Sequence, residues 1–202
     1  MAAESAWVWD LVDLAAAQAA GDLAGMDLAL GRLREAGRES EVEEAILQSY
    51  LFLGFPSAIE AFRRWRAQGV ETPDPTDEDP GLWMERGART CTTVYGDHYE
   101  QLRRNIARFH PELDRWMVME GYGKVLGRPG LGLGTREMLI VAMLVVQGES
   151  GRRQLRSHLK GALNAGVAPE DVEQTIRRAA AFAPAENLEL ARDLWSAVLD
   201  SQ

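Results

Sequence analysis

An uninterrupted apolar run, MLIVAMLVV at residues 138–146, is the feature that most constrains how this chain can fold. Thr135 is a suitable helix cap just before the run, and Glu137 would lie near the positive end of a helix that begins there. Because a helix that is apolar all round must be covered on every side, we expect residues 136–147 to form a buried central helix. The run is far too short to span a bilayer.

Helical periodicity covers most of the rest of the chain, with glycines, prolines and capping residues at the segment ends. The further helices that we expect lie at residues 6–20, 23–36, 41–53, 57–68, 83–108, 113–126, 152–165, from Pro169 on, and 187–199. No segment makes a convincing pair of strands. The expected fold class is therefore all-α, a helical bundle.

Residues 69–82, GVETPDPTDEDPGL, contain three prolines and five acids. Such a composition cannot pack a core and predicts a linker. The linker would separate an N-terminal helical domain, residues 1–68, from a C-terminal domain, residues 83–202.

The N-terminal part also contains a weaker copy of the C-terminal pattern. Residues 28–62 match residues 127–176 mainly at core and cap positions, which predicts an internal duplication of a helical unit. Ala29 stands where the second copy has His158. If one copy is catalytic, we therefore expect it to be the second, and the first to be degenerate.

Composition excludes several classes of function. A net charge of −9 argues against nucleic acid as a partner, because phosphate binding needs clustered cations. The single cysteine, Cys91, rules out an internal disulfide framework and fits a reducing cytosol. The N-terminus has no basic region of the kind that opens a secretory signal, so we expect a cytoplasmic protein without a membrane partner. The three histidines are isolated in sequence, which gives no support to a metal site.

His158 is the strongest candidate for chemistry. It follows Gln154 by four residues, which places the two side chains on one helix face. An imidazole at the border of the apolar face can act as a general acid or base near neutral pH. The alternative interpretation is a structural histidine that is hydrogen-bonded to a neighbouring helix.

Four further charged residues could contribute to the same pocket. Arg136 could hold a substrate carboxylate, and Glu137 could assist proton transfer, although both are also explained by electrostatics in the first turn of a helix. Glu149 and Arg152 precede the histidine helix and could line the rim of the pocket. Alternatively, they are solvated charges of a turn.

The C-terminal motifs, taken in order, resemble the carboxymuconolactone decarboxylase family, which includes alkylhydroperoxidase D-like proteins. They are Arg128-Pro129-Gly130-Leu131, Thr135-Arg136-Glu137, His158 with Ala162 and Gly166, and Glu170-Asp171-Val172. The resemblance implies an α-helical bundle, cofactor-free chemistry in the decarboxylase branch, and a homo-oligomer (dimer, trimer or hexamer).

The departures from the family pattern are informative. The peroxidase branch carries a Cys-x-x-Cys pair before the histidine, and those positions are Gly151 and Gln154 here. Thiol peroxidase activity needs a nucleophilic thiolate and a second thiol to regenerate it, so it is disfavoured. The decarboxylase branch often has Glu where this chain has Gln154, and an amide cannot carry a proton.

Three hypotheses follow. The first is cofactor-free decarboxylation or proton transfer on a small carboxylated, lactone-type substrate, with His158, Glu137 and Gln154 as catalytic residues and Arg136, Glu149 and Arg152 as binding residues. The second is a non-catalytic helical oligomer that serves as a scaffold or binding protein. The third is an alkylhydroperoxidase-like antioxidant protein.

Overall fold

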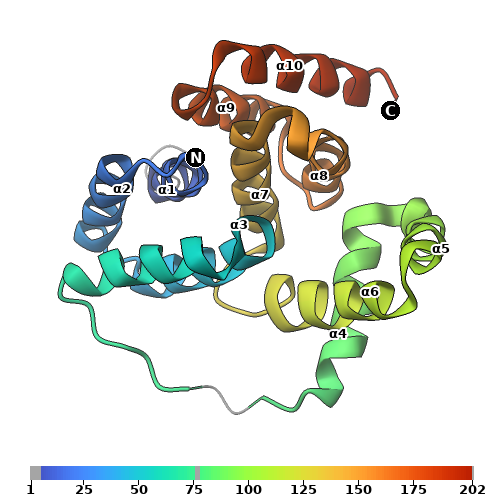
Figure 1. The fold of residues 1–202 in the computed structure, drawn as a ribbon, viewed down its shortest axis with the longest axis horizontal. Helices are drawn as coiled ribbons and strands as arrows, with labels where there is room; N and C mark the ends of the chain where they lie inside the picture. The colour runs from blue at the N-terminus through green and yellow to red at the C-terminus, as the bar shows by residue number, and fades with distance from the viewer. Residues whose placement is uncertain (1–5, 76–77, 202) are drawn as a thin grey trace. The chain divides into compact units, whose positions relative to one another are not determined.

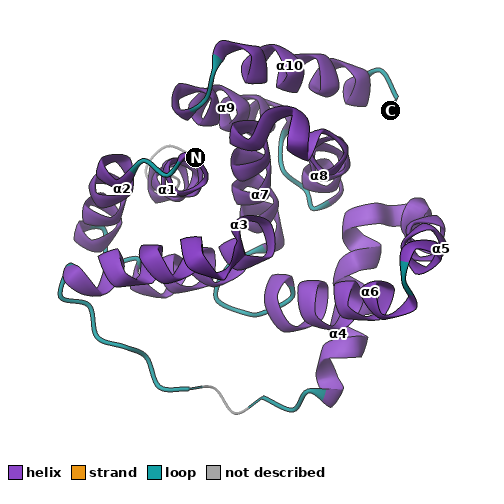
Figure 2. Ribbon diagram, in the orientation of Figure 1, coloured by secondary structure: helices purple, strands orange, loops and turns teal. Residues whose placement is uncertain are grey.

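The computed structural model describes residues 6–75 and 78–201 of the 202-residue chain. Within these residues every regular element is a helix and no strand occurs, which confirms the all-α fold class (Figure 2). Residues 1–5, on which the expectation about a secretory signal depends, lie outside the described residues. So do residues 76–77 of the expected linker.

The chain forms two compact units whose boundaries differ from the expected domains. One unit joins the residues up to Thr72 to those from Gly130 onward, and the other runs from Pro73 to Pro129. The expected division into 1–68 and 83–202 is therefore not the one that the fold adopts. The physical reason is the central helix: the helices that follow it cover only part of its surface, and N-terminal helices cover the rest.

The first unit is a bundle around α7, Leu133–Gln147 (Figure 1). Residues 136–145 of α7 are all buried, as the apolar run predicted. The α-helices that contact α7 are α1 (Ala6–Ala20), α3 (Glu39–Ala67), α8 (Arg152–Asn164), α9 (Pro169–Ala179) and α10 (Ala185–Leu199). Two short segments, η3 (Gly148–Gly151) and η4 (Ala180–Phe182), also contact it. Helix α2 (Leu23–Glu35) packs on α1 and α3.

Helix α3 is in effect two helices that meet at Gly54. This residue has φ 78° and ψ 164°, a conformation that glycine adopts readily, and Pro56 follows it. The predicted end at Gly54 and restart near Ser57 are thus confirmed as a sharp kink. By length and composition α3 is also the one helix in the described residues that could cross a membrane, with 33% of its most apolar window buried. Those two criteria do not distinguish a membrane span from a core helix.

The geometry at three helix starts shows which local cap signals operate. Asp22, which precedes α2, is a cap because its side chain accepts a hydrogen bond from the Gly25 amide at 3.0 Å. Thr135, predicted as a cap, is not one, since α7 begins two residues earlier, after an extended Gly132. Ser40 and Glu43 have the spacing of a capping box, but α3 begins at Glu39 and Glu43 binds Arg66 and Trp65 instead.

The second unit contains the helices of residues 81–126. They are α4 (Gly81–Tyr95), η1 (Gly96–His98), α5 (Tyr99–Phe109), α6 (Pro111–Trp116) and η2 (Met117–Leu126), the last of which is a π-helix. The helix predicted over 83–108 is therefore interrupted, at Gly96 with φ 53°. Helices α4 and η2 pack with their backbones in contact, and a Cβ atom on Gly87 or Gly123 would clash with a carbonyl oxygen of the facing helix.

Candidate functional site

Glu137 and His158 meet in the interior of the first unit. Glu137 lies near the start of α7 and His158 near the middle of α8, and the two helices pack against each other. The Nδ1 atom of His158 lies 2.8 Å from Oε2 of Glu137. Glu137 is fully buried and His158 is 4% exposed. The sequence predicted both residues for the same site, and the structure brings them together.

The environment of this pair is largely apolar. The ring of Phe52, from α3, meets the imidazole edge to face, with centroids 5.5 Å apart and planes at 81°. The second carboxylate oxygen of Glu137, Oε1, is buried and has no hydrogen-bond partner among the described residues. Burying such an oxygen without a partner costs about 1–3 kcal/mol. The Glu137–His158 pair is therefore held at a cost to stability, a pattern that is common at functional sites.

Arg136 does not point into this site, although it precedes Glu137. Its guanidinium donates to Glu44 Oε2 at 2.7 Å, to Gln48 Oε1 at 3.2 Å and to the carbonyl of Leu131 at 3.1 Å. The side chain is fully buried and its charge is matched by that of Glu44. The prediction that Arg136 is a carboxylate clamp is therefore wrong for this conformation: Arg136 ties the start of α7 to α3.

The remaining predicted site residues lie on the surface. Gln154 is exposed. It lies one helical turn before His158, but its side chain does not enter the interior with the imidazole. Glu149 and Arg152 form an ion pair of 3.1 Å, with side chains 75% and 50% exposed. The structure thus favours the alternative interpretation for these two residues, solvated charges of a turn.

Sequence reasoning missed three residues of the surroundings, all on α3. Glu44 and Gln48 contact Arg136, and Phe52 contacts His158. The three follow one another at intervals of four and so form one stripe of the helix. That stripe, with two polar residues among buried apolar ones, is the signal in the sequence that could have identified them.

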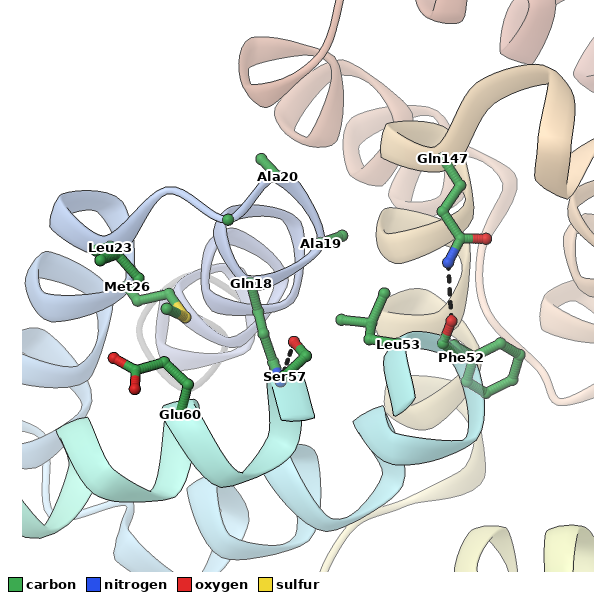
Figure 3. A pocket seen from close by; sticks show the side chains of 11 residues that line it. Gln18, Ala19, Ala20, Leu23, Met26, Phe52, Leu53, Ser57, Glu60 and Gln147 are labelled. Carbon is green, nitrogen blue, oxygen red and sulfur yellow. Dashed lines mark hydrogen bonds between the residues drawn. The ribbon is translucent and has the colours of Figure 1, made fainter. Parts of the chain in front are cut away.

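A cavity of about 530 Å³ lies next to this stripe, between α1, α2, α3 and α7 (Figure 3). Its lining includes Phe52 and Gln147 but none of the site residues predicted from the sequence. The lining residues are Gln18, Ala19, Ala20, Gly21, Leu23, Met26, Phe52, Leu53, Ser57, Glu60 and Gln147. Phe52 is thus the residue that contacts both the cavity and His158.

Neither metal nor thiol chemistry gains support from the described residues. They contain no group of three or more His, Cys, Asp or Glu side chains that could hold a metal ion. Cys91 is fully buried on α4, in the second unit, whereas Gly151 and Gln154 occupy the positions of the family's cysteine pair in the first.

Comparison with known proteins places part of this chain close to a known family. Residues 111–197 match the sequence model of the carboxymuconolactone decarboxylase family. This segment includes α7 and α8, and therefore Glu137 and His158. In this segment the chain is similar to the carboxymuconolactone decarboxylase family.

The relatives cover different shares of the chain. This chain is 28% identical to 4-carboxymuconolactone decarboxylase of Acinetobacter baylyi over 106 residues. The aligned residues are 51% of this chain and 78% of that protein. The chain is 30% identical over 141 residues to Peroxisomal protein 2 of Schizosaccharomyces pombe, 65% of this chain and 63% of that protein. An uncharacterized protein of Paracoccus denitrificans is 28% identical over 104 residues, 50% of this chain and 76% of that protein. The chain thus spans less than two thirds of the yeast protein.

Proposed function

We propose that this protein is a member of the carboxymuconolactone decarboxylase family and catalyses cofactor-free proton transfer on a small lactone-type substrate. His158 would carry the proton and Glu137 would position the imidazole. The observation that carries the proposal is the buried contact of 2.8 Å between Nδ1 of His158 and Oε2 of Glu137. A carboxylate that accepts a hydrogen bond from one imidazole nitrogen fixes the tautomer in which the other ring nitrogen carries no hydrogen and can act as a base.

The chemical step follows from that arrangement. The imidazole takes a proton from the carbon next to the lactone carbonyl, the C–H bond breaks, and its electron pair moves to the carbonyl oxygen. The imidazolium then returns the proton to the same or a conjugated carbon. In decarboxylation, His158 starts as the imidazolium. The C–C bond to the departing CO₂ breaks, its electron pair moves to the carbonyl oxygen, the imidazolium protonates the resulting enolate, and the imidazole regains a proton from water. General acid–base catalysis of this type contributes about 10²- to 10⁴-fold to a rate.

The test is hydrogen exchange and CO₂ release by the full chain. We expect deuterium from the solvent to enter a butenolide probe, measured by NMR, and His158→Ala to lower the rate by about 10²- to 10⁴-fold. Decarboxylation of 4-carboxymuconolactone is measured in parallel, because the Acinetobacter relative is named for it. Arg156→Ala, an exposed position on the same helix, is the control and should retain the rate. Equal rates for wild type and His158→Ala would remove the histidine from the mechanism.

A second candidate function is a non-catalytic helical scaffold or binding protein. The observations that favour it are the 4% exposure of His158 and the hydrogen bonds of the Arg136 guanidinium to Glu44, Gln48 and the Leu131 carbonyl. This candidate predicts that no probe exchanges faster than in buffer and that His158→Ala changes only stability. The expected homo-oligomer and the cytoplasmic location stay predictions under either candidate.

A further inference from the structure

The cavity beside Phe52 differs in chemistry from the site that the family's carboxylated substrate would require. We propose that this cavity binds an uncharged lactone, ester or ketone, and that Phe52 is the gate between the bound molecule and His158. The binding part of this proposal stands by itself, whereas the gate rests on the proposed function of His158.

The position of Phe52 supports its role as the gate. Its backbone side faces the cavity, and its ring points away from Gln18 and Leu23 on the opposite wall (Figure 3). The same ring packs on the imidazole of His158, with centroids 5.5 Å apart. Phe52 therefore contacts both a solvent-accessible cavity and an imidazole that is only 4% exposed.

The backbone carbonyl of Phe52 is held by a side-chain hydrogen bond in place of a helical one. In a continuous helix its carbonyl would accept a hydrogen bond from residue 56, but Pro56 has no N–H group. The side chain of Gln147 supplies the missing donor instead, at 2.9 Å (Figure 3). Gly54, with φ 78°, provides a hinge two residues further on. The Phe52 carbonyl is thus bound by a side chain of α7 and not by the next turn of its own helix.

The polar groups of the cavity include a hydroxyl donor for a ligand that accepts hydrogen bonds. Ser49 donates its hydroxyl hydrogen to the carbonyl of Ile46, so it accepts from Gln18 Nε2 at 2.8 Å. That nitrogen also lies 3.3 Å from Ser57 Oγ. Because Ser57 Oγ accepts in this network, its hydroxyl hydrogen can be donated to the carbonyl oxygen of a bound lactone, ester or ketone.

The charges of the cavity do not suit a carboxylate. Glu60 is the one ionisable side chain in the lining, and no Arg or Lys lines the cavity among the described residues. A hydrogen bond from Arg63, with a further one from Arg64, lowers the pKa of Glu60 to about 2, so it carries a negative charge at neutral pH. The net charge of −9 also repels anions over longer distances. A volume of about 530 Å³ is sufficient for a small organic molecule.

The binding test uses two probes that differ in charge and by one methyl group: butenolide acetic acid, an anion at pH 7, and its uncharged methyl ester. We expect the ester to bind at least ~10-fold more tightly than the anion, because the cavity has no cation to replace the water around a carboxylate. Ala20→Trp should weaken ester binding by a similar factor, because Ala20 is an exposed cavity residue at the end of α1. Ala67→Trp is the matched control, an exposed alanine at the end of α3 outside the cavity. Tighter binding of the anion, or equal ester binding by both tryptophan variants, would overturn the assignment.

The gate is tested by the access of a reagent to the imidazole. Diethyl pyrocarbonate should modify His158 slowly in the wild type and at least ~10-fold faster in Phe52→Ala, followed by mass spectrometry of the peptide that contains it. The methyl ester should slow that modification again. Phe55→Ala is the control, because Phe55 lies on the same helix but is 65% exposed and outside the cavity. An unchanged rate in Phe52→Ala, or no protection by the ester, would overturn the gate.

These outcomes separate the cavity from the proposed catalysis. His158→Ala should retain ester binding, since the histidine does not line the cavity. Binding without any hydrogen exchange would refute the proposed function and leave the binding site intact. Exchange that depends on His158 but is unaffected by Ala20→Trp would refute the binding site and leave the function intact.

Discussion

Arg136 and Glu137 are consecutive residues on α7 and both are fully buried, yet their side chains differ in how completely they are hydrogen-bonded. The Arg136 guanidinium donates hydrogen bonds to Glu44, Gln48 and the Leu131 carbonyl. Glu137 has one oxygen on His158 and one, Oε1, without a partner among the described residues. A satisfied buried charge holds a fold together, whereas a partly satisfied one retains capacity for chemistry.

Substitution of Arg136 should have the largest effect on stability. We expect Arg136→Met to lower the free energy of unfolding by about 3–5 kcal/mol, because it leaves the Glu44 carboxylate buried without its partner. Urea unfolding followed by circular dichroism measures the change. The double variant Arg136→Met with Glu44→Leu should recover most of the loss, since it buries no charge. A single variant within 1 kcal/mol of wild type would show that the pair is not structural.

Glu137→Gln should change the activity more than the stability, whereas Arg136→Met should chiefly change the stability. The substitution removes a charge that is only partly satisfied, so we expect the stability to change by less than about 1 kcal/mol. The rate of proton transfer should fall by about 10- to 100-fold, as is typical when a residue that orients a functional histidine is replaced.

A purely structural role for Glu137 predicts a different result. In that case the stability would fall and the rate measured on the folded protein would be that of the wild type. The Arg136/Glu44 double variant is the matched comparison, because it perturbs the same end of α7 without touching the imidazole. Its rate of proton transfer should stay close to that of the wild type.

The contrast between the two residues also shows what the sequence could predict. The burial of α7 follows from the apolar run 138–146, and the positive φ of Gly37, Gly148 and Gly166 marks helix ends that local patterns identify. That Glu137 contributes to the pocket of His158 was one of the two interpretations that the sequence left open. These are local or family-specific signals.

The features that were not predictable depend on contacts between distant segments. Arg136 and Glu44 are 92 residues apart. No local sequence pattern distinguishes an arginine that pairs with a carboxylate of the same chain from an arginine that binds a substrate. The division into units was missed for the same reason. A linker composition predicts where a chain is unpacked, but it does not show which helices before it return to cover α7.

The ion pair of Glu78 with Arg86, which is partly exposed, should contribute less to the free energy of unfolding than the buried pair of Arg136 with Glu44. In the second unit, hydrogen bonds from Arg86 and from the Trp83 indole lower the pKa of Glu78 from 4.5 to about 2. Because the pKa is lower in the folded state, the stabilisation is complete above pH 4.5 and is lost as the pH falls toward 2. The side chains of Glu78 and Arg86 are 25% and 16% exposed, so water screens the pair. We expect the contribution to be at most about 1 kcal/mol.

The test is the difference in stability between wild type and Glu78→Gln, measured by thermal unfolding from pH 6 down to pH 2. The difference isolates this carboxylate from the other 30 acidic residues among the 31 of the chain. It should be largest above pH 5 and vanish near pH 2, because only the wild type loses a charged partner of Arg86. Glu112→Gln is the control, since the ion pair of Glu112 with Arg115 is 3.7 Å long and about half exposed. Curves that fall in parallel for wild type and Glu78→Gln would contradict the assigned pKa. They would also show that hydrogen-bonded ion pairs of this kind, unlike Arg136 with Glu44, leave the stability of the fold unchanged.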